Sequence, residues 1–284
     1  MIWSDLFISL RHKQWIKNLF VLAALIFAKK FLDKEAVGLS FLAFVAFCLV
    51  SSSVYLINDV ADAEKDKVHP LKKSRPIAMG TLSKSAAILA AIVLLFIAVF
   101  VSFKLGIWFL IILLFYWLLN LCYSFYLKNL VILDVITVAI GFVLRVIAGA
   151  VAIQVIFSSW LLLCTFFLTL FLAIGKRKNE MANILGNGAR EVLARYSLPL
   201  LDQMAMIVLP STLITYALYT FNSGHSAWLI ATVPVVLYGL FRYLYIIDKK
   251  NNSDNGPSDD LLLDRPLQAT VLFWAALVIV ILYF

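Results

Sequence analysis

The run AVGLSFLAFVAFCLVSSSVYLI, residues 36–57, leads directly into NDVADAEKD, residues 58–66. The first stretch is mostly apolar and has the length of an α-helix that crosses the hydrocarbon core of a bilayer, for which about 20 residues are needed. The second stretch is polar and acidic, so the chain leaves the apolar phase near Asn58. The junction therefore predicts a membrane-spanning helix that carries a polar site at one end.

The composition extends this prediction to the whole chain. Of its 284 residues, 63% are hydrophobic and only 14% are charged, and the mean hydropathy is +0.97. A soluble domain would lack the polar surface to cover so much apolar material. The formal net charge of +8 could attract nucleic acid. In so apolar a chain it fits better a basic membrane face that meets anionic lipid or a phosphorylated substrate.

Nine segments are long and apolar enough to cross a membrane, so we expect one all-α, polytopic membrane domain over residues 1–284. Most Lys and Arg residues fall at the N-terminus and in the loops after the second, fourth, sixth and eighth segments, which the positive-inside rule assigns to the cytoplasm. We therefore expect a plasma-membrane protein whose N-terminus and two long charged loops, about 59–84 and 179–200, are cytoplasmic. The segments lie near 16–32, 36–57, 85–103, 105–125, 131–152, 158–178, 201–223, 226–247 and 267–284.

The acidic stretch has the pattern N-D-x-x-D-x-x-x-D. Asn58, Asp62 and Asp66 are spaced four residues apart, so they share one face if the helix continues. Carboxylates at that spacing repel one another unless a cation lies among them, and oxygen ligands suit Mg²⁺, which commonly bridges protein carboxylates and substrate phosphates. The alternative is a solvated, charge-patterned helix end. The cations that follow at Lys72 and Arg75 favour a site for a metal-bound diphosphate.

Arg145 lies inside an apolar segment, where a charge is costly and normally lines a cavity or meets an anion. We expect it to bind an anionic lipid substrate. The alternative is a structural ion pair elsewhere in the bundle. Asp134 lies three turns away on the same face, about 16 Å along the axis, so the two side chains need different partners.

Other polar residues are open to two interpretations. Lys17 enters the first apolar segment at the depth expected for Asn58, although most such lysines only anchor a helix end. Lys176, Arg177 and Glu180 gather charge at the start of the second long loop, where cations are usually topological. The cysteines and histidines show neither pairing nor metal-ligand spacing, so we assign them no catalytic role. They are Cys48, Cys122, Cys164, His12, His69 and His225.

Taken in order, these motifs resemble the UbiA-type superfamily of intramembrane prenyltransferases, and more closely its decaprenyl-phosphate phosphoribosyltransferase branch. The resemblance implies nine helices around a central cavity, with aspartate motifs on two cytoplasmic loops that hold Mg²⁺ and a diphosphate. The second loop offers Glu180, and Asp202 follows further on, but there is no DxxxD motif, a departure that the phosphoribosyl branch shares. The resemblance is carried by residues 13–18, 55–66, 69–78, 123–128, 141–149 and 175–177.

The resemblance also implies a reaction, in which 5-phosphoribosyl passes from phosphoribosyl diphosphate to a polyprenyl phosphate and diphosphate is released. It implies that Asn58 and Asp62 bind Mg²⁺, that Asp66 lies near the metal or the ribose, and that Arg145 binds the lipid phosphate. No general base is expected, because the attacking phosphate is already ionised. The other substrate-binding residues that we expect are Lys17, Tyr55, Lys72, Arg75, Tyr123, Lys128, Lys176, Arg177 and Glu180.

Two other functions remain open at this level. An ordinary UbiA-type prenyltransferase would move a prenyl group from a prenyl diphosphate to an aromatic or lipid acceptor. A lipid transporter or flippase would explain the helices and Arg145 but not the acidic motif. The sequence also lacks the internal repeat that many transporters have.

Overall fold

The computed structural model describes residues 2–68, 72–156, 158–183, 191–222, 224, 226–249 and 257–283, and every regular element in these ranges is a helix. Eight helical segments there are long and apolar enough to cross a membrane, which confirms the all-α, polytopic fold. They are α3 (Lys34–Ala61), α6 (Lys84–Ser102) with η3 (Phe103–Leu105), α7 (Ile107–Phe125), α8 (Leu133–Ala152), α9 (Ser159–Asn183), α10 (Leu198–Asn222), η6 (Ala227–Thr232) with α11 (Val233–Lys249), and α13 (Arg265–Tyr283).

The first predicted segment, 16–32, is not a continuous α-helix. It consists of the 3₁₀ helix η1 (His12–Leu22) and the short helix α2 (Ala23–Phe27). A 3₁₀ helix rises about 2.0 Å per residue, so the two together reach about 30 Å, the thickness of a bilayer core. The slender segment packs closely on α8, because a Cβ atom at Gly149 would lie only 1.9 Å from the Val21 carbonyl oxygen.

Shorter helices complete the chain between the spans. Among them, α12 (Pro257–Leu263) packs against α9 and η1. The shorter helices are α1 (Ile2–Ser9), α4 (Ala63–Lys67), η2 (Lys72–Ser74), α5 (Pro76–Met79), η4 (Leu127–Asn129), η5 (Glu191–Arg195) and α12 (Pro257–Leu263).

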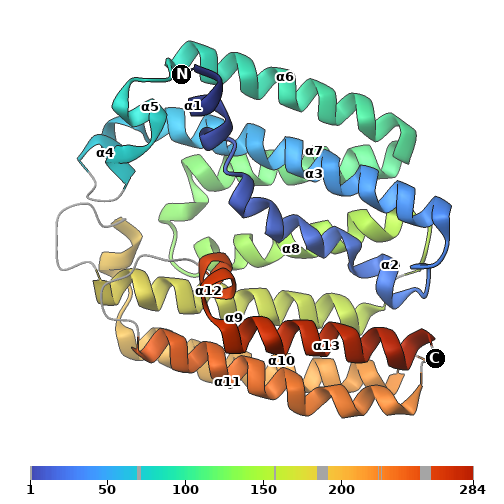
Figure 1. Cartoon of the computed structure of the whole chain (residues 1–284). Helices are drawn as coiled ribbons and strands as arrows, with labels where there is room; N and C mark the ends of the chain where they lie inside the picture. The colour runs from blue at the N-terminus through green and yellow to red at the C-terminus, as the bar shows by residue number, and fades with distance from the viewer. Residues whose placement is uncertain are drawn as a thin grey trace.

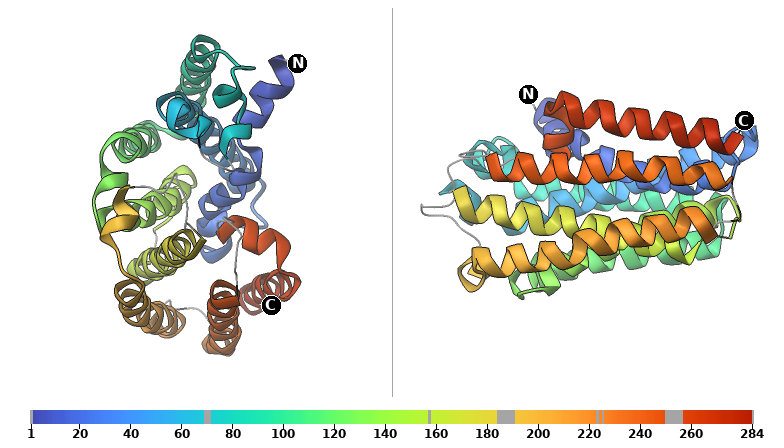
Figure 2. Two further views of the ribbon diagram at one scale, coloured as in Figure 1. Left: turned by 90° about the vertical axis from the view of Figure 1, so that its left-hand side faces the viewer. Right: turned by 90° about the horizontal axis from the view of Figure 1, so that it is seen from below.

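The long helices run side by side, and seen end-on they stand around a common axis (Figure 1 and Figure 2). The helices α1, α4, α5 and α12 lie at one end of the bundle, on the left in Figure 1, and we name this the polar end. The last turn of α13 lies at the opposite end. The first helix, α1, and the last turn of α13 are therefore at opposite ends of the bundle, as the eight long spans together with the segment η1–α2 require.

An aspartate lies at each end of α3, the helix that leads into the acidic motif. The Asp33 carboxylate accepts hydrogen bonds from the backbone N–H groups of Glu35 and Ala36 at 3.1 and 3.3 Å, which caps the first turn. The Ala36 hydrogen bond and the neighbouring Lys30 hold the pKa of Asp33 below its usual value. At the polar end Asp62 follows the last helical residue, with φ −91° and ψ 4°, and α4 begins directly after it.

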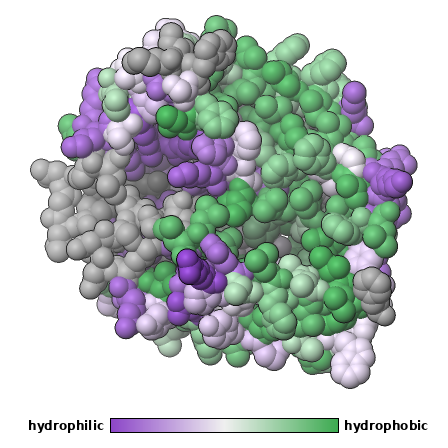
Figure 3. Space-filling view, in the orientation of Figure 1, coloured by the Kyte–Doolittle hydropathy of each residue, from purple (hydrophilic) through white to green (hydrophobic). Residues whose placement is uncertain are grey.

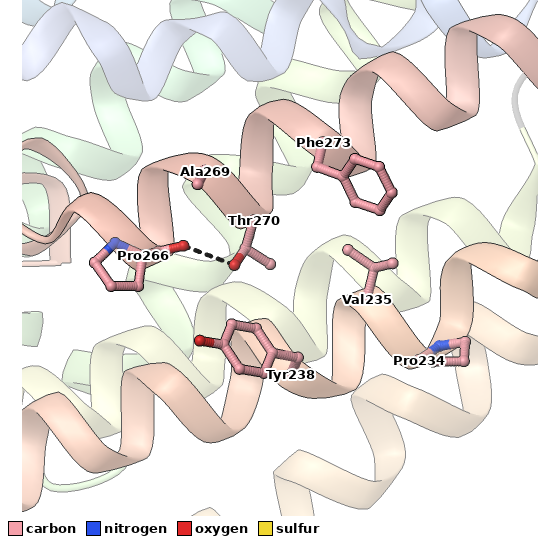
Figure 4. A pocket seen from close by; sticks show the side chains of 7 residues that line it. All are labelled: Pro234, Val235, Tyr238, Pro266, Ala269, Thr270 and Phe273. Carbon is pink, nitrogen blue, oxygen red and sulfur yellow. Dashed lines mark hydrogen bonds between the residues drawn. The ribbon is translucent and has the colours of Figure 1, made fainter.

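A groove of about 500 Å³ lies between α11 and α13 (Figure 4). The Thr270 hydroxyl in this groove is satisfied within α13, since it donates to the Pro266 carbonyl oxygen at 2.7 Å. No residue in its lining is charged, so the groove is an apolar surface feature and not the polar site that the sequence predicts. The lining residues are Pro234, Val235, Tyr238, Pro266, Ala269, Thr270 and Phe273.

Candidate active site at the polar end

Hydrophilic residues gather at the polar end of the molecule (Figure 3). The middle of the face seen there is mostly hydrophobic, and a smaller hydrophilic patch marks the opposite end. This is the distribution expected when an apolar belt lies between two polar surfaces. The acidic motif at the end of α3 belongs to the larger of the two polar regions.

Asp62 contacts a cation that is distant in sequence. Its two carboxylate oxygens accept hydrogen bonds from Lys128 Nζ at 2.8 and 2.9 Å, and both side chains are partly accessible to solvent. Lys128 lies on η4, just after α7, so this contact joins the ends of α3 and α7. The sequence predicted both as site residues, and the structure brings them together.

Asp66 belongs to a second cluster. Arg75 donates hydrogen bonds to Asp66 at 2.6 Å and to Asp59 at 3.1 Å, and Arg11 also donates to Asp59. Asp62 and Asp66 are one helical turn apart, with the Asp66 N–H donating to the Asp62 carbonyl oxygen at 2.8 Å, but their carboxylates contact different cations. Residues seven apart on a helix differ by only about 20° around the axis. Asp66 therefore shares the buried face of Asp59, and the carboxylates of the motif divide between two sets of cations.

Asn58 and Asp62 are the oxygen donors of this motif that suit a Mg²⁺ ion. They are four residues apart at the end of α3, and both are half-buried. Among the residues that the structure describes, no three His, Cys, Asp or Glu side chains are grouped to hold a metal. Mg²⁺ keeps several waters and usually takes one or two protein carboxylates together with substrate phosphates. The donor set thus fits a metal that a diphosphate helps to bind, with Lys128 beside it.

Arg145 is buried within the bundle, only 5% exposed. Its Nε donates to Asn18 Oδ1 at 2.8 Å, its Nη1 to the Gly141 carbonyl oxygen at 2.9 Å and its Nη2 to the Tyr116 hydroxyl at 2.6 Å. In the described ranges no carboxylate forms an ion pair with it, and Asp134 has a different partner. The alternative of a structural ion pair for Arg145 therefore finds no support in those ranges.

Arg177 is the centre of a buried network that joins α7, α8 and α9. It donates to Asp134 at 2.6 Å, to the Tyr123 hydroxyl at 3.0 Å, and to Glu180. The Tyr196 hydroxyl donates to the other oxygen of Asp134 at 2.7 Å, and burial together with this hydrogen bond raises the pKa of Tyr196. The predicted substrate residues Tyr123, Arg177 and Glu180 do lie together, but their polar groups contact one another.

Tyr55, Lys72 and Lys176 each lie beside a residue of these clusters. The Arg11 guanidinium lies over the Tyr55 ring, 5.1 Å from its centre, and Lys176 Nζ is 3.7 Å from Glu180. Lys17 lies in η1 and Lys72 in η2, whereas His69 and His225 fall outside the described residues.

Several residues of these clusters received no role from the sequence. Asp59 could have been found from its spacing of seven residues to Asp66, which places both on one helix face. Asn18 and Tyr116 are polar groups inside apolar segments, where an unsatisfied hydrogen-bonding group is costly, but nothing local connects them to Arg145. Nothing in the sequence around Tyr196 indicates its hydrogen bond to Asp134.

Comparison with known proteins gives the family. The chain matches the UbiA prenyltransferase family over residues 18–259. The decaprenyl-phosphate phosphoribosyltransferase of Mycolicibacterium smegmatis is 33% identical to it, over 99% of this chain and 93% of that protein. The protein of the same name from Corynebacterium glutamicum is 34% identical, over 97% of this chain and 86% of its own.

Solved structures agree with the fold. A UbiA homolog from Archaeoglobus fulgidus bound to DMAPP and Mg²⁺ has a TM-score of 0.73 at 17% identity, with 99% of each chain covered. The same homolog bound to GPP and Mg²⁺ has a TM-score of 0.71 at 18% identity, covering 99% of this chain and 100% of that one. The resemblance expected from the motifs is thus confirmed, and the chain belongs to the UbiA prenyltransferase family.

Proposed function

We propose that this chain transfers the 5-phosphoribosyl group of phosphoribosyl diphosphate to a polyprenyl phosphate such as decaprenyl phosphate, with release of diphosphate. Near full-length similarity to relatives named for this activity supports the reaction. The observation that supports the proposed location is the contact between Asp62 and Lys128, a carboxylate and a cation 2.8 Å apart at the polar end.

The second long loop supports a phosphoribosyl donor over a prenyl diphosphate. The residues 179–200 contain no DxxxD motif, and the carboxylate of Glu180 is engaged by Arg177. A prenyl diphosphate held between two acidic motifs would need a second set of metal ligands there. One acidic motif surrounded by cations suits a donor that brings both a diphosphate and a 5-phosphate.

The proposed roles of the site residues follow from their charges. Asn58 and Asp62 would hold Mg²⁺, which supplies positive charge against the diphosphate as it departs. Lys17, Lys72 and Lys128 bind the phosphate groups of the donor near this metal. Asp66, fixed by Arg75, lies near the ribose, and Arg145 binds a substrate phosphate inside the bundle. Tyr55, Arg75, Tyr123, Lys176, Arg177 and Glu180 form the wall of the same site.

In the chemical step, an oxygen of the polyprenyl phosphate forms a bond to C1 of the ribose. The bond from C1 to the diphosphate oxygen breaks, and the diphosphate keeps the electron pair. No proton has to leave the nucleophile, since a phosphate monoester is ionised at neutral pH, and the site needs no general base. The cations bring together two polyanions that would otherwise repel each other.

A second candidate is transfer of a prenyl group from a prenyl diphosphate to an aromatic or lipid acceptor. The family match favours it, and so do the Archaeoglobus fulgidus complexes with DMAPP and GPP. The test is a two-donor assay with the purified protein and Mg²⁺. One arm holds labelled phosphoribosyl diphosphate with decaprenyl phosphate, and the other a labelled prenyl diphosphate with an aromatic acceptor. We expect labelled lipid-linked phosphoribose in the first arm. No product there, with turnover in the second, would reverse the assignment.

We further propose that the protein resides in the plasma membrane with its polar end in the cytoplasm. Phosphoribosyl diphosphate is a soluble, highly charged donor that cannot cross a bilayer unaided, and a cytoplasmic site would meet it directly. The concentration of Lys and Arg at this end supports the same orientation.

A further inference from the structure

Arg145 is a buried cation whose partners among the described residues are all neutral. It lies twelve residues into α8, about 18 Å from the start of that helix, and a guanidinium stays protonated at any physiological pH. Its described partners are an amide oxygen, a carbonyl oxygen and a hydroxyl, with the rings of Tyr116 and Phe142 centred 4.7 and 4.9 Å away. Since an uncompensated charge is strongly unfavourable in a bilayer, the arrangement calls for an anion.

The guanidinium keeps donors free for that anion. It has five N–H groups, and three are used by Asn18, Gly141 and Tyr116. One hydrogen remains on each of the two terminal nitrogens. These two hydrogens are donors that the oxygens of a phosphate or carboxylate can accept.

The Tyr116 hydroxyl has a hydrogen to contribute to the same ligand. The oxygen accepts from Arg145 Nη2 at 2.6 Å, so its own hydrogen points to another acceptor. Tyr116 is only 2% exposed, which excludes bulk water as that acceptor. Within the described ranges no protein group takes this hydrogen, and an anion beside Arg145 would satisfy both residues.

Asn18 fixes the direction of the guanidinium. Its amide nitrogen donates to Ser51 Oγ at 3.1 Å and to Cys48 Sγ at 3.4 Å, which uses both amide hydrogens and turns the carbonyl oxygen to Arg145 Nε. The residue is 1% exposed. Asn18 therefore orients the cation without adding a charge that would neutralise it.

We propose that Arg145 and Tyr116 together bind one phosphate monoester inside the helix bundle, and that Asn18 is the positioning residue that aims the guanidinium at it. The inference rests on the proposed function for the identity of the ligand, since both proposed substrates carry a phosphate monoester. These are the headgroup of the polyprenyl phosphate and the 5-phosphate of phosphoribosyl diphosphate.

This subsite is separate from the acidic motif. Ser51, the partner of Asn18, precedes Asp62 by eleven residues on α3, about 16 Å along the helix axis. A phosphate at Arg145 is thus not the diphosphate at Asp62. A donor whose diphosphate lies at Asp62 can extend its 5-phosphate towards Arg145, and a polyprenyl phosphate can reach it from the membrane core. The ligand chemistry is the same in both cases.

The sharpest test is Asn18→Asp, a change of nearly identical shape that puts a carboxylate against Arg145 Nε. The new carboxylate supplies the missing counter-charge and competes with the phosphate. We expect the ligand-free protein to unfold at a higher temperature, and the KM for one of the two substrates to rise at least tenfold while the other stays within about twofold. The substrate whose KM rises identifies the source of the phosphate.

Tyr116→Phe tests the hydroxyl without changing charge or ring packing. We expect the KM for the same substrate to rise about tenfold, and kcat to change less. Tyr216→Phe is the matched control, because its hydroxyl is also buried but bonds Thr232 and Trp274, and both of its KM values should equal those of the wild type. KM values within twofold of wild type for both substrates in Asn18→Asp and in Tyr116→Phe would overturn the proposal.

A binding measurement keeps this inference distinct from the proposed reaction. Thermal unfolding is followed with farnesyl phosphate alone and with phosphoribosyl diphosphate alone, both without Mg²⁺. We expect one of them to stabilise the wild type and the Tyr216→Phe control, and to lose this effect in Tyr116→Phe. A protein without transferase activity that still shows this pattern would retain the subsite and reject the reaction. If the protein is an active transferase but the ligand stabilises Tyr116→Phe as much as the wild type, the reaction is retained and the subsite is rejected.

Discussion

Arg177 Nε donates to the Asp134 carboxylate at 2.6 Å, and both side chains are almost completely buried. The pair links α8 to α9 across 43 residues of sequence. Tyr196 extends the link, since its hydroxyl donates to Asp134 and accepts from the Ile132 backbone N–H at 2.7 Å. Ile132 has a φ of 71°, a conformation that β-branched residues rarely adopt. The network therefore holds a strained backbone at the start of α8 and anchors the second long loop.

Loss of Asp134 should destabilise the fold. Asp134→Asn leaves the buried Arg177 cation with one carboxylate in place of two, and breaking a buried pair costs about 3 kcal/mol. Thermal unfolding in detergent measures the loss. Asp202→Asn is the control, because its pair with Lys178 is partly exposed and should contribute at most about 1 kcal/mol. Equal losses in the two variants would show that burial of the pair does not matter.

Asp62→Asn should abolish turnover while leaving the protein folded. The change removes the negative charge that would hold Mg²⁺ and that now pairs with Lys128, but it keeps the shape of the side chain. We expect kcat to fall on the order of a hundredfold or more. Glu64→Gln is the control, since this exposed carboxylate pairs only with Lys67 and Lys84 in the described residues. An active Asp62→Asn enzyme would remove Asp62 from the site.

Metal removal gives an independent check on the acidic motif. A site of few oxygen ligands completed by substrate phosphates and waters suits Mg²⁺, and Mn²⁺ shares its preference for oxygen ligands. We expect a chelator to stop the transfer, Mg²⁺ to restore it and Mn²⁺ to restore part of it. Ca²⁺ should support less activity, because it prefers longer bonds and more ligands. Initial rates across a metal titration measure this, and an undiminished rate in excess chelator would exclude a metal-dependent reaction.

The orientation in the membrane can be tested by cysteine labelling. Lys65 lies at the polar end and Lys104 at the opposite end, and both are exposed. Cys122 is the exposed native thiol and Cys48 and Cys164 are buried, so the variants are made in a Cys122→Ser background. A membrane-impermeant maleimide should label Lys104→Cys in intact cells and Lys65→Cys only after permeabilisation. The opposite pattern would place the polar end outside.

The sequence alone located eight of the nine predicted spans as long helices, and the polar end with its acidic motif, although not the exact ends of the helices. These features depend on local properties. An apolar run of sufficient length must form a helix in a bilayer because each backbone N–H and C=O needs a partner inside the segment. Charged residues at the ends of such runs must leave the hydrocarbon, which gathers them on two surfaces.

Only the tertiary structure decided which charges meet. Lys128 and Asp62 are 66 residues apart and Arg145 and Asn18 are 127 apart, and nothing in either local pattern selects the other. Three other features also depend on the tertiary structure. They are the division of the acidic motif between Lys128 and Arg75, the 3₁₀ form of η1 and the packing of α12 on α9. The physical reason is the separation along the chain over which each interaction acts. Helix formation and burial in lipid are set by neighbouring residues, whereas the pairing of buried charges is set by which helices pack together and at what height.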